Sequence, residues 1–145
     1  GGGDAFTANW EQVDTTGQGY IAGAVMSESS GIFTFPETGI YWVSITGQLY
    51  TGVDATGSVR LGLEIDGTTN NSSYATWAEG DLWNPSNQYT FASTQASTMV
   101  DVTDTTQVKV KFLCQNGGSN NPTRIWRGAT TMNLTYATFV KLGGT

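Results

Sequence analysis

The amino-acid sequence predicts an all-β protein, an antiparallel sandwich or barrel built from short strands. Apolar side chains recur at every second position in several stretches, which is the spacing of a strand and not of a helix. Clusters of Gly, Pro, Asn and Asp separate these stretches, as turns do. Only 12% of the residues are charged, about half the share of an average domain, whereas Thr occurs 23 times.

Four longer stretches carry this alternation, and one face of each is expected to be buried while the other faces water. The expected core rows are Tyr41, Val43, Ile45 and Leu49; Val59, Leu61, Leu63 and Ile65; Thr98, Val100 and Val102 followed by Val108, Val110, Phe112 and Cys114; and Leu134, Tyr136, Val140 and Leu142. Shorter candidate strands cover residues 6–10, 20–26, 32–35 and 88–91. Eight or more strands with no convincing helix favour an antiparallel arrangement.

Length and composition bound the possible functions. The 145 residues predict a single domain over residues 6–142, preceded by the end of a linker at 1–5 and followed by a tail at 143–145. The chain has no His and one Cys, Cys114, which is expected in the core, so serine–histidine and cysteine–histidine catalysis and zinc sites are disfavoured. The net charge of -6 disfavours nucleic-acid partners, and the apolar runs are too short for membrane insertion. No metal or cofactor is expected.

One motif resembles a known family. Residues 31–43 read Gly-Ile-Phe-Thr-Phe-Pro-Glu-Thr-Gly-Ile-Tyr-Trp-Val, which is similar to the central signature of the complement component 1q globular head and its tumour necrosis factor relatives. Pro36 lacks an amide hydrogen and closes a short strand, Gly39 permits an unusual backbone angle, and Tyr41 and Val43 then point to one side. Residues 99–110 and 136–142 resemble later strands of the same family. Val43, Thr105-Thr106 and Lys141 depart from its pattern.

The resemblance implies a jelly roll of about ten strands that acts as a homotrimer. Apolar residues on the faces opposite the core rows are expected to form the trimer interface, because a monomer would leave them exposed. These interface residues are Trp42, Tyr50, Met99, Leu113 and Phe139. The resemblance places the strands of Trp42, Leu113 and Phe139 in one sheet. The alternative is that these residues are individually exposed aromatic and apolar side chains, which are common in monomers.

A loop over residues 70–89 is the candidate ligand site. It is rich in aromatic, carboxylate and amide side chains, which together recognise sugars by stacking and by hydrogen bonds to hydroxyl groups. The candidate residues are Tyr74, Trp77, Glu79, Asp81, Trp83, Asn84 and Asn87. Trp126, between Arg124 and Arg127, is a second candidate, suited to an acidic sugar or a neighbouring subunit. Alternatively, the loop folds over its own aromatic residues as a satellite core.

These observations predict a non-enzymatic, trimeric recognition or adhesion head that binds a cell-surface glycan or receptor, with no cofactor. Abundant Thr, Asn and Gly with scarce charge resemble the heads of viral fibres and of bacterial collagen-like surface proteins. This resemblance favours the tip or decoration domain of a virion or phage fibre, and it implies an extracellular location on a virion or cell surface. One alternative is a trimerisation cap that binds nothing. Another is a glycan hydrolase, in which Glu79 and Asp81 would face each other across a cleft.

Overall fold

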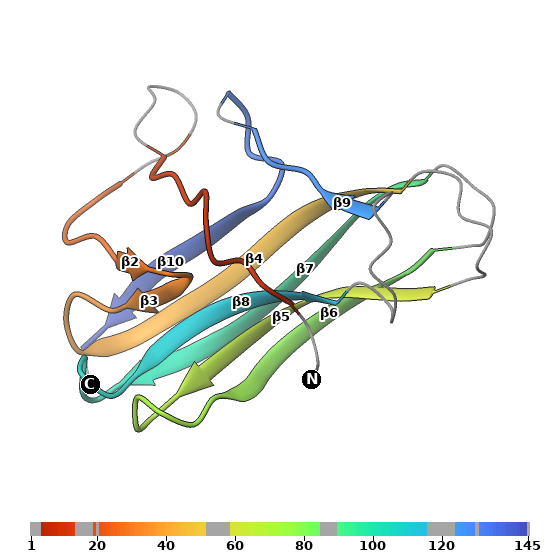
Figure 1. Cartoon of the computed structure of the whole chain (residues 1–145). Coiled ribbons are helices and arrows are strands. Elements are labelled where there is room, and N and C mark those ends of the chain that lie inside the picture. Colours follow the sequence, from red (N-terminus) through yellow and green to blue (C-terminus); the bar gives the residue numbers. More distant parts are fainter. Residues whose placement is uncertain are drawn as a thin grey trace.

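Two antiparallel sheets make up the described part of the protein in the computed structural model (Figure 1). The described residues are 4–13, 19, 21–51, 59–84, 90–115, 124–129 and 131–144. Within them there are ten strands and no helix. The strands are β1 (Asp4–Ala5), β2 (Ser27–Ser29), β3 (Ile32–Thr34), β4 (Gly39–Thr51), β5 (Val59–Thr68), β6 (Ala75–Asn84), β7 (Thr90–Val102), β8 (Lys109–Gln115), β9 (Arg124–Trp126) and β10 (Tyr136–Gly143). The all-β prediction is confirmed.

The two sheets differ in size and in strand order. The first has the order β2-β3-β8-β5-β6, and β1 also pairs with β8. The second has the order β10-β4-β7, and β9 pairs with β4 near its C-terminal end. Two of the shorter candidate strands are found at least in part: residues 32–35 contain β3, and residues 90–91 begin β7. Residues 88–89 and Tyr20 lie outside the described residues. Residues 6–10 and 21–26 are not strands.

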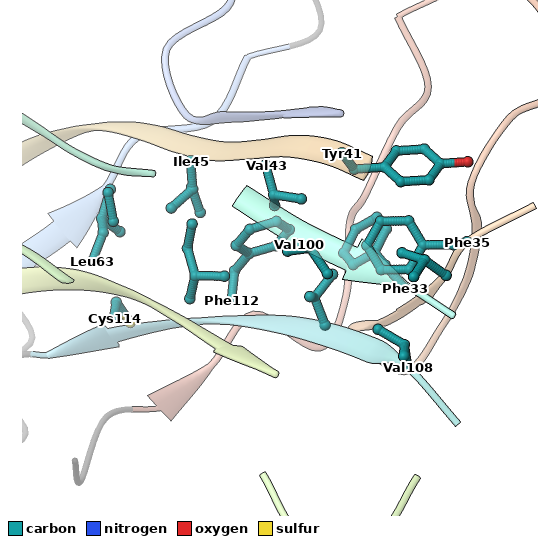
Figure 2. Packing of buried hydrophobic residues seen from close by; sticks show 14 residues of the cluster. Phe33, Phe35, Tyr41, Val43, Ile45, Leu63, Val100, Val108, Phe112 and Cys114 are labelled. Carbon is teal, nitrogen blue, oxygen red and sulfur yellow. The ribbon is translucent and has the colours of Figure 1, made fainter. Parts of the chain in front are cut away.

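The core lies between the two sheets (Figure 2). Val43 and Ile45 project from β4 toward Phe112 of β8, and Tyr41 lies beside Phe35, with ring centroids 4.8 Å apart. Residues 61–65, 100–102 and 108–114 also bury the predicted rows, and Cys114 is buried as expected. The prediction from alternation is therefore confirmed for these three rows where their side chains are described.

The fourth predicted row, on β10, is wrong by one position. Phe139 packs against the core, with ring centroids 5.3 Å from Phe33 and 5.9 Å from Phe112, whereas Val140 and Leu142 are exposed. This stretch is apolar on both faces, so its periodicity is ambiguous. The pairing register with β4 determines which face of β10 is buried. Phe139 lies directly opposite the buried Val43, and residues that lie opposite each other on paired strands share a face of the sheet.

The face of β5 that was expected to be exposed to solvent is also mostly buried. Glu64 and Asp66 are at most 9% exposed, because β5 lies inside the sheet between β8 and β6. Gln115 of β8 donates a hydrogen bond to the Glu64 carboxylate. The ammonium of Lys111 lies 3.7 Å from an Asp66 carboxylate oxygen. Polar side chains of β8 therefore cover these carboxylates from the outside.

The motif at residues 31–43 has the backbone that its glycines predict. Gly39 has a φ of 145°, and a Cβ there would lie 2.5 Å from the carbonyl oxygen of Gly143. Only Gly combines this angle with such a close approach to β10. The Tyr41 hydroxyl donates to the Glu37 carbonyl at 3.0 Å, and burial raises the pKa of Tyr41. The motif therefore anchors the start of β4 against β10.

Candidate functional site

The predicted ligand loop contains a strand, so this prediction is wrong for most of its length. Residues 75–84 form β6, which pairs along its length with β5. The register shifts where Ile65 faces Ala78 and Asp66 faces Thr76, which leaves Trp77 as an extra residue in β6. Because of this bulge, both Trp77 and Ala78 pack against the core.

Trp77 is consequently not available as a sugar-stacking surface. It is half-buried, and its ring fills the space beside Gly67, where a Cβ would lie 2.1 Å from a ring carbon. This outcome matches the alternative interpretation, in which aromatic residues of this segment extend the core. Tyr74 is half-buried as well, with the Lys111 ammonium 4.5 Å from its ring centroid, and desolvation raises the pKa of Tyr74.

Three of the predicted ligand residues remain on one exposed face. Glu79, Asp81 and Trp83 occupy alternate positions of β6 and therefore project from the same side of the strand. Trp83 is 65% exposed. Glu79 and Asp81 are neighbours on one face of a single strand, whereas the hydrolase alternative expects them to face each other across a cleft. Asn84 ends β6 opposite Val59, and Asn87 lies outside the described residues.

Trp126 was expected to be an exposed contact, and the structure contradicts this. It lies in β9 opposite the buried Leu49, is half-buried, and packs against the core. A Cβ at Gly47 would lie 2.9 Å from Trp126 ring carbons, so the missing side chain of Gly47 makes room for the indole. Arg127 directly follows β9, and because successive residues of an extended chain alternate in direction, its side chain is directed away from the core.

Arg127 joins an aromatic cluster that the sequence did not reveal. Its guanidinium carbon lies 5.6 Å from the ring centroid of Phe91, and its backbone N–H donates to the Gln48 carbonyl at 2.8 Å. Phe91 faces Tyr50 across β7 and β4, with ring centroids 5.0 Å apart. Sequence separation hid this cluster, because its members come from three distant segments that only strand pairing brings together.

Two of the residues expected in a trimer interface lie together on an exposed face. Trp42 is 37% exposed and Met99 is 58% exposed, and the two are direct cross-strand partners in the second sheet. Leu113 and Phe139 do not belong with them. Leu113 is buried in the first sheet, where Ala5 and Glu64 flank it on the two neighbouring strands, and Phe139 is directed into the core.

Two residues of β10 take the place of Leu113 and Phe139 on this surface. Val140, which is 44% exposed, lies directly opposite Trp42 on the side away from Met99. Leu142 is exposed as well, two residues further along β10, where the register with β4 shifts. We call Trp42, Met99, Val140 and Leu142 the Trp42 patch. Tyr50 shares the outer face of β4 with Trp42 but lies at its opposite end.

Other kinds of site are not apparent in these residue ranges. No group of three or more Cys, Asp or Glu side chains in the described ranges is arranged to hold a metal ion. The described segments contain no helix that is long and apolar enough to cross a membrane. Comparison with known protein families and with curated proteins gives no match for this chain.

Proposed function

We propose that this chain is a non-enzymatic head domain that assembles into a homotrimer through the Trp42 patch and recognises glycans or receptors on a cell surface. The observation that carries this proposal is the patch itself. Trp42 has an exposed apolar residue directly opposite it on both neighbouring strands, Met99 on β7 and Val140 on β10. Contiguous exposed apolar residues of this kind mark interaction surfaces.

The strand order supports a jelly roll. The chain passes from β3 in the first sheet to β4 in the second, returns for β5 and β6, crosses again for β7, returns for β8 and ends with β10 in the second sheet. As a result, the neighbours of β8 and β4 in their sheets are distant in sequence. Such repeated crossing is typical of Greek-key and jelly-roll folds. This strand order agrees with the resemblance to the complement component 1q and tumour necrosis factor heads. That resemblance in turn implies a trimer.

A second copy of the chain is the occupant that best fits the Trp42 patch. Full burial of a large apolar side chain contributes about 1.5–3 kcal/mol, so the patch offers a substantial driving force for association. A charged or nucleic-acid partner would have little to pair with there, because the four patch residues carry no charge. A trimer would present every surface outside the interface three times. Three copies of one binding surface raise the avidity for a repetitive target, such as a cell surface covered with glycans.

Light scattering coupled to size exclusion tests the assembly. The wild-type chain is expected at three times the mass of one chain, and Trp42→Lys is expected to elute as a monomer, because burial of an unpaired ammonium opposes association. Trp83→Lys is the matched control, since it makes the same substitution on the outer face of the other sheet and should leave the trimer intact. Circular dichroism would establish that both variants fold. A monomeric wild type at micromolar concentration would overturn the proposal.

A specific observation also favours the trimerisation cap without a ligand. Trp77 and Trp126, two of the aromatic residues expected to contact a glycan, pack against the core. The cap predicts that the wild-type trimer binds no glycan or host cell. A glycan array with the wild-type trimer separates the two functions, because reproducible binding of any glycan contradicts the cap.

A further inference from the structure

We propose that Tyr50, Phe91, Arg127 and Gln48 form a binding site for a sugar that carries a carboxylate, such as a sialic or uronic acid. We call these four residues the Arg127 cluster. This inference rests on the proposed recognition function and names the class of ligand. It does not depend on the Trp42 patch, because Tyr50 and Trp42 are eight residues apart on β4, roughly 26 Å along an extended strand.

The aromatic part of the cluster is a cross-strand pair. Tyr50 and Phe91 face each other between β4 and β7, with ring centroids 5.0 Å apart and ring planes inclined at 43°. Both lie on the side of the second sheet away from the core, and Phe91 is 65% exposed. An aromatic surface held on a paired strand is rigid, so it can stack against the C–H face of a sugar ring with little loss of conformational freedom.

The cationic part of the cluster is held in position by β4. The backbone N–H of Arg127 donates to the Gln48 carbonyl at 2.8 Å, and its Nη1 donates to the Gln48 side-chain oxygen. The guanidinium carbon lies 5.6 Å from the Phe91 ring centroid, a cation–π contact. The hydrogen bond from Nη1 and the cation–π contact together fix the position of the guanidinium. A guanidinium has five N–H donors, so this one hydrogen bond leaves further donors for a ligand.

This arrangement favours an acidic sugar over a neutral one. A guanidinium pairs with a carboxylate through two parallel hydrogen bonds, and none of the four cluster residues carries a negative charge that would compete. Gln48 contributes amide hydrogen-bonding capacity for a hydroxyl group next to the carboxylate. The aromatic pair supplies the contact that a simple inorganic anion cannot use. The combination therefore matches a ring with one apolar face and one carboxylate.

Titration by nuclear magnetic resonance with sialyllactose and with lactose tests the site. These two probes share the lactose unit and differ in the acidic sugar. We expect sialyllactose to bind the wild-type chain at least about tenfold more tightly than lactose, because charge-assisted hydrogen bonds are stronger than neutral ones. Arg127→Gln should abolish this preference, and Phe91→Ala should weaken binding of sialyllactose. Raising the salt concentration should also weaken it.

Trp83→Ala is the matched control, because Trp83 is as exposed as Phe91 and lies on the opposite sheet. It should leave binding of sialyllactose unchanged. The proposal is overturned if neither probe binds, if lactose binds equally well, or if Trp83→Ala abolishes binding while Phe91→Ala does not. It is also overturned if Phe91→Ala and Arg127→Gln dissociate the oligomer, since the cluster would then be a subunit contact. A monomeric wild type that still prefers sialyllactose would refute the trimer and retain this site.

Discussion

At the scale of single residues, short polar contacts determine the turns that join the sheets. Asp104 lies in the turn between β7 and β8, and its carboxylate accepts hydrogen bonds of 2.7 Å from both the backbone N–H and the hydroxyl of Thr106. Its backbone carbonyl accepts from Val108 at 2.9 Å. The carboxylate of Asp104 therefore stabilises the turn between β7 and β8.

Asp104 is expected to make the stability of the protein depend on pH in the acid range. The hydroxyl and backbone hydrogen bonds from Thr106 lower the pKa of the Asp104 carboxyl. The contribution of Asp104 to stability is therefore fully present above the ordinary pKa of an unfolded aspartate, and it is lost as the pH falls through the lowered pKa of the folded state. Urea unfolding should find Asp104→Asn less stable than wild type at neutral pH, with the difference shrinking in acid.

Thr106→Val is the control for this prediction, because it removes the hydroxyl donor and leaves the carboxylate in place. Thr106→Val should reduce, but not remove, the loss of unfolding free energy that the wild-type protein shows in acid. A difference between wild type and Asp104→Asn that stays constant from neutral pH down to the acid range would show that the hydrogen bonds do not favour the charged form.

At the scale of strands, register determines which face of an apolar segment is buried. On β10 both faces carry apolar residues, and pairing with β4 places Phe139 beside Val43 and Val140 beside Trp42. On β6 the bulge at Trp77 turns an aromatic residue inward. In both elements, a shift of one residue exchanges a core position for a surface position.

The assignment of faces on β10 can be tested by truncating two consecutive residues. Phe139→Ala should lower the free energy of unfolding by about 3 kcal/mol, because it leaves a cavity among the rings of Phe33, Phe35 and Phe112. Val140→Ala should change it by less than about 1 kcal/mol, since Val140 is exposed within the single chain. Both should be measured by urea unfolding in the Trp42→Lys background, which removes subunit association. An equal decrease in the free energy of unfolding for Phe139→Ala and Val140→Ala would contradict the pairing register of β10 with β4.

At the scale of the whole molecule, the two sheets approach each other most closely along β6 and β7. No ladder joins these strands in the described residues, yet a Cβ at Gly80 would lie 1.8 Å from the carbonyl oxygen of Gln95. The Thr94 hydroxyl also donates to the Asp81 carbonyl at 3.4 Å. Gly80 therefore permits the two sheets to approach closely on this side of the sandwich.

Gly80→Ala is expected to destabilise the protein strongly. The new methyl group would overlap a backbone atom, which cannot rotate away as a side chain can, so the strands must separate at a cost of about 3 kcal/mol. Thermal unfolding should show a large decrease in Tm. Gly128→Ala is the matched control, because nothing lies within 4 Å of the added carbon, and its Tm should be nearly that of wild type. Similar Tm values for the two variants would contradict the close approach.

Local patterns in the sequence were sufficient where one face of a strand is clearly apolar. The rows on β4, β5 and β8, the positive φ of Gly39 and the burial of Cys114 could all be predicted, because each depends on neighbours within a few residues. The exposed Trp42 and Met99 followed from the same alternation. The ligand site was less predictable, since Trp77 and Trp126 look equally suited to a surface or a core in the sequence.

The amino-acid sequence by itself determined that this chain forms antiparallel strands around a core of alternating apolar residues. This pattern depends only on side chains two positions apart, which share one face of a strand. Only the tertiary structure decided the direction of Trp77, Trp126 and Phe139, and the meeting of Phe91 with Arg127. The physical reason is that bulges, register and the contact between sheets depend on residues far apart in the chain, whose pairing no local pattern encodes.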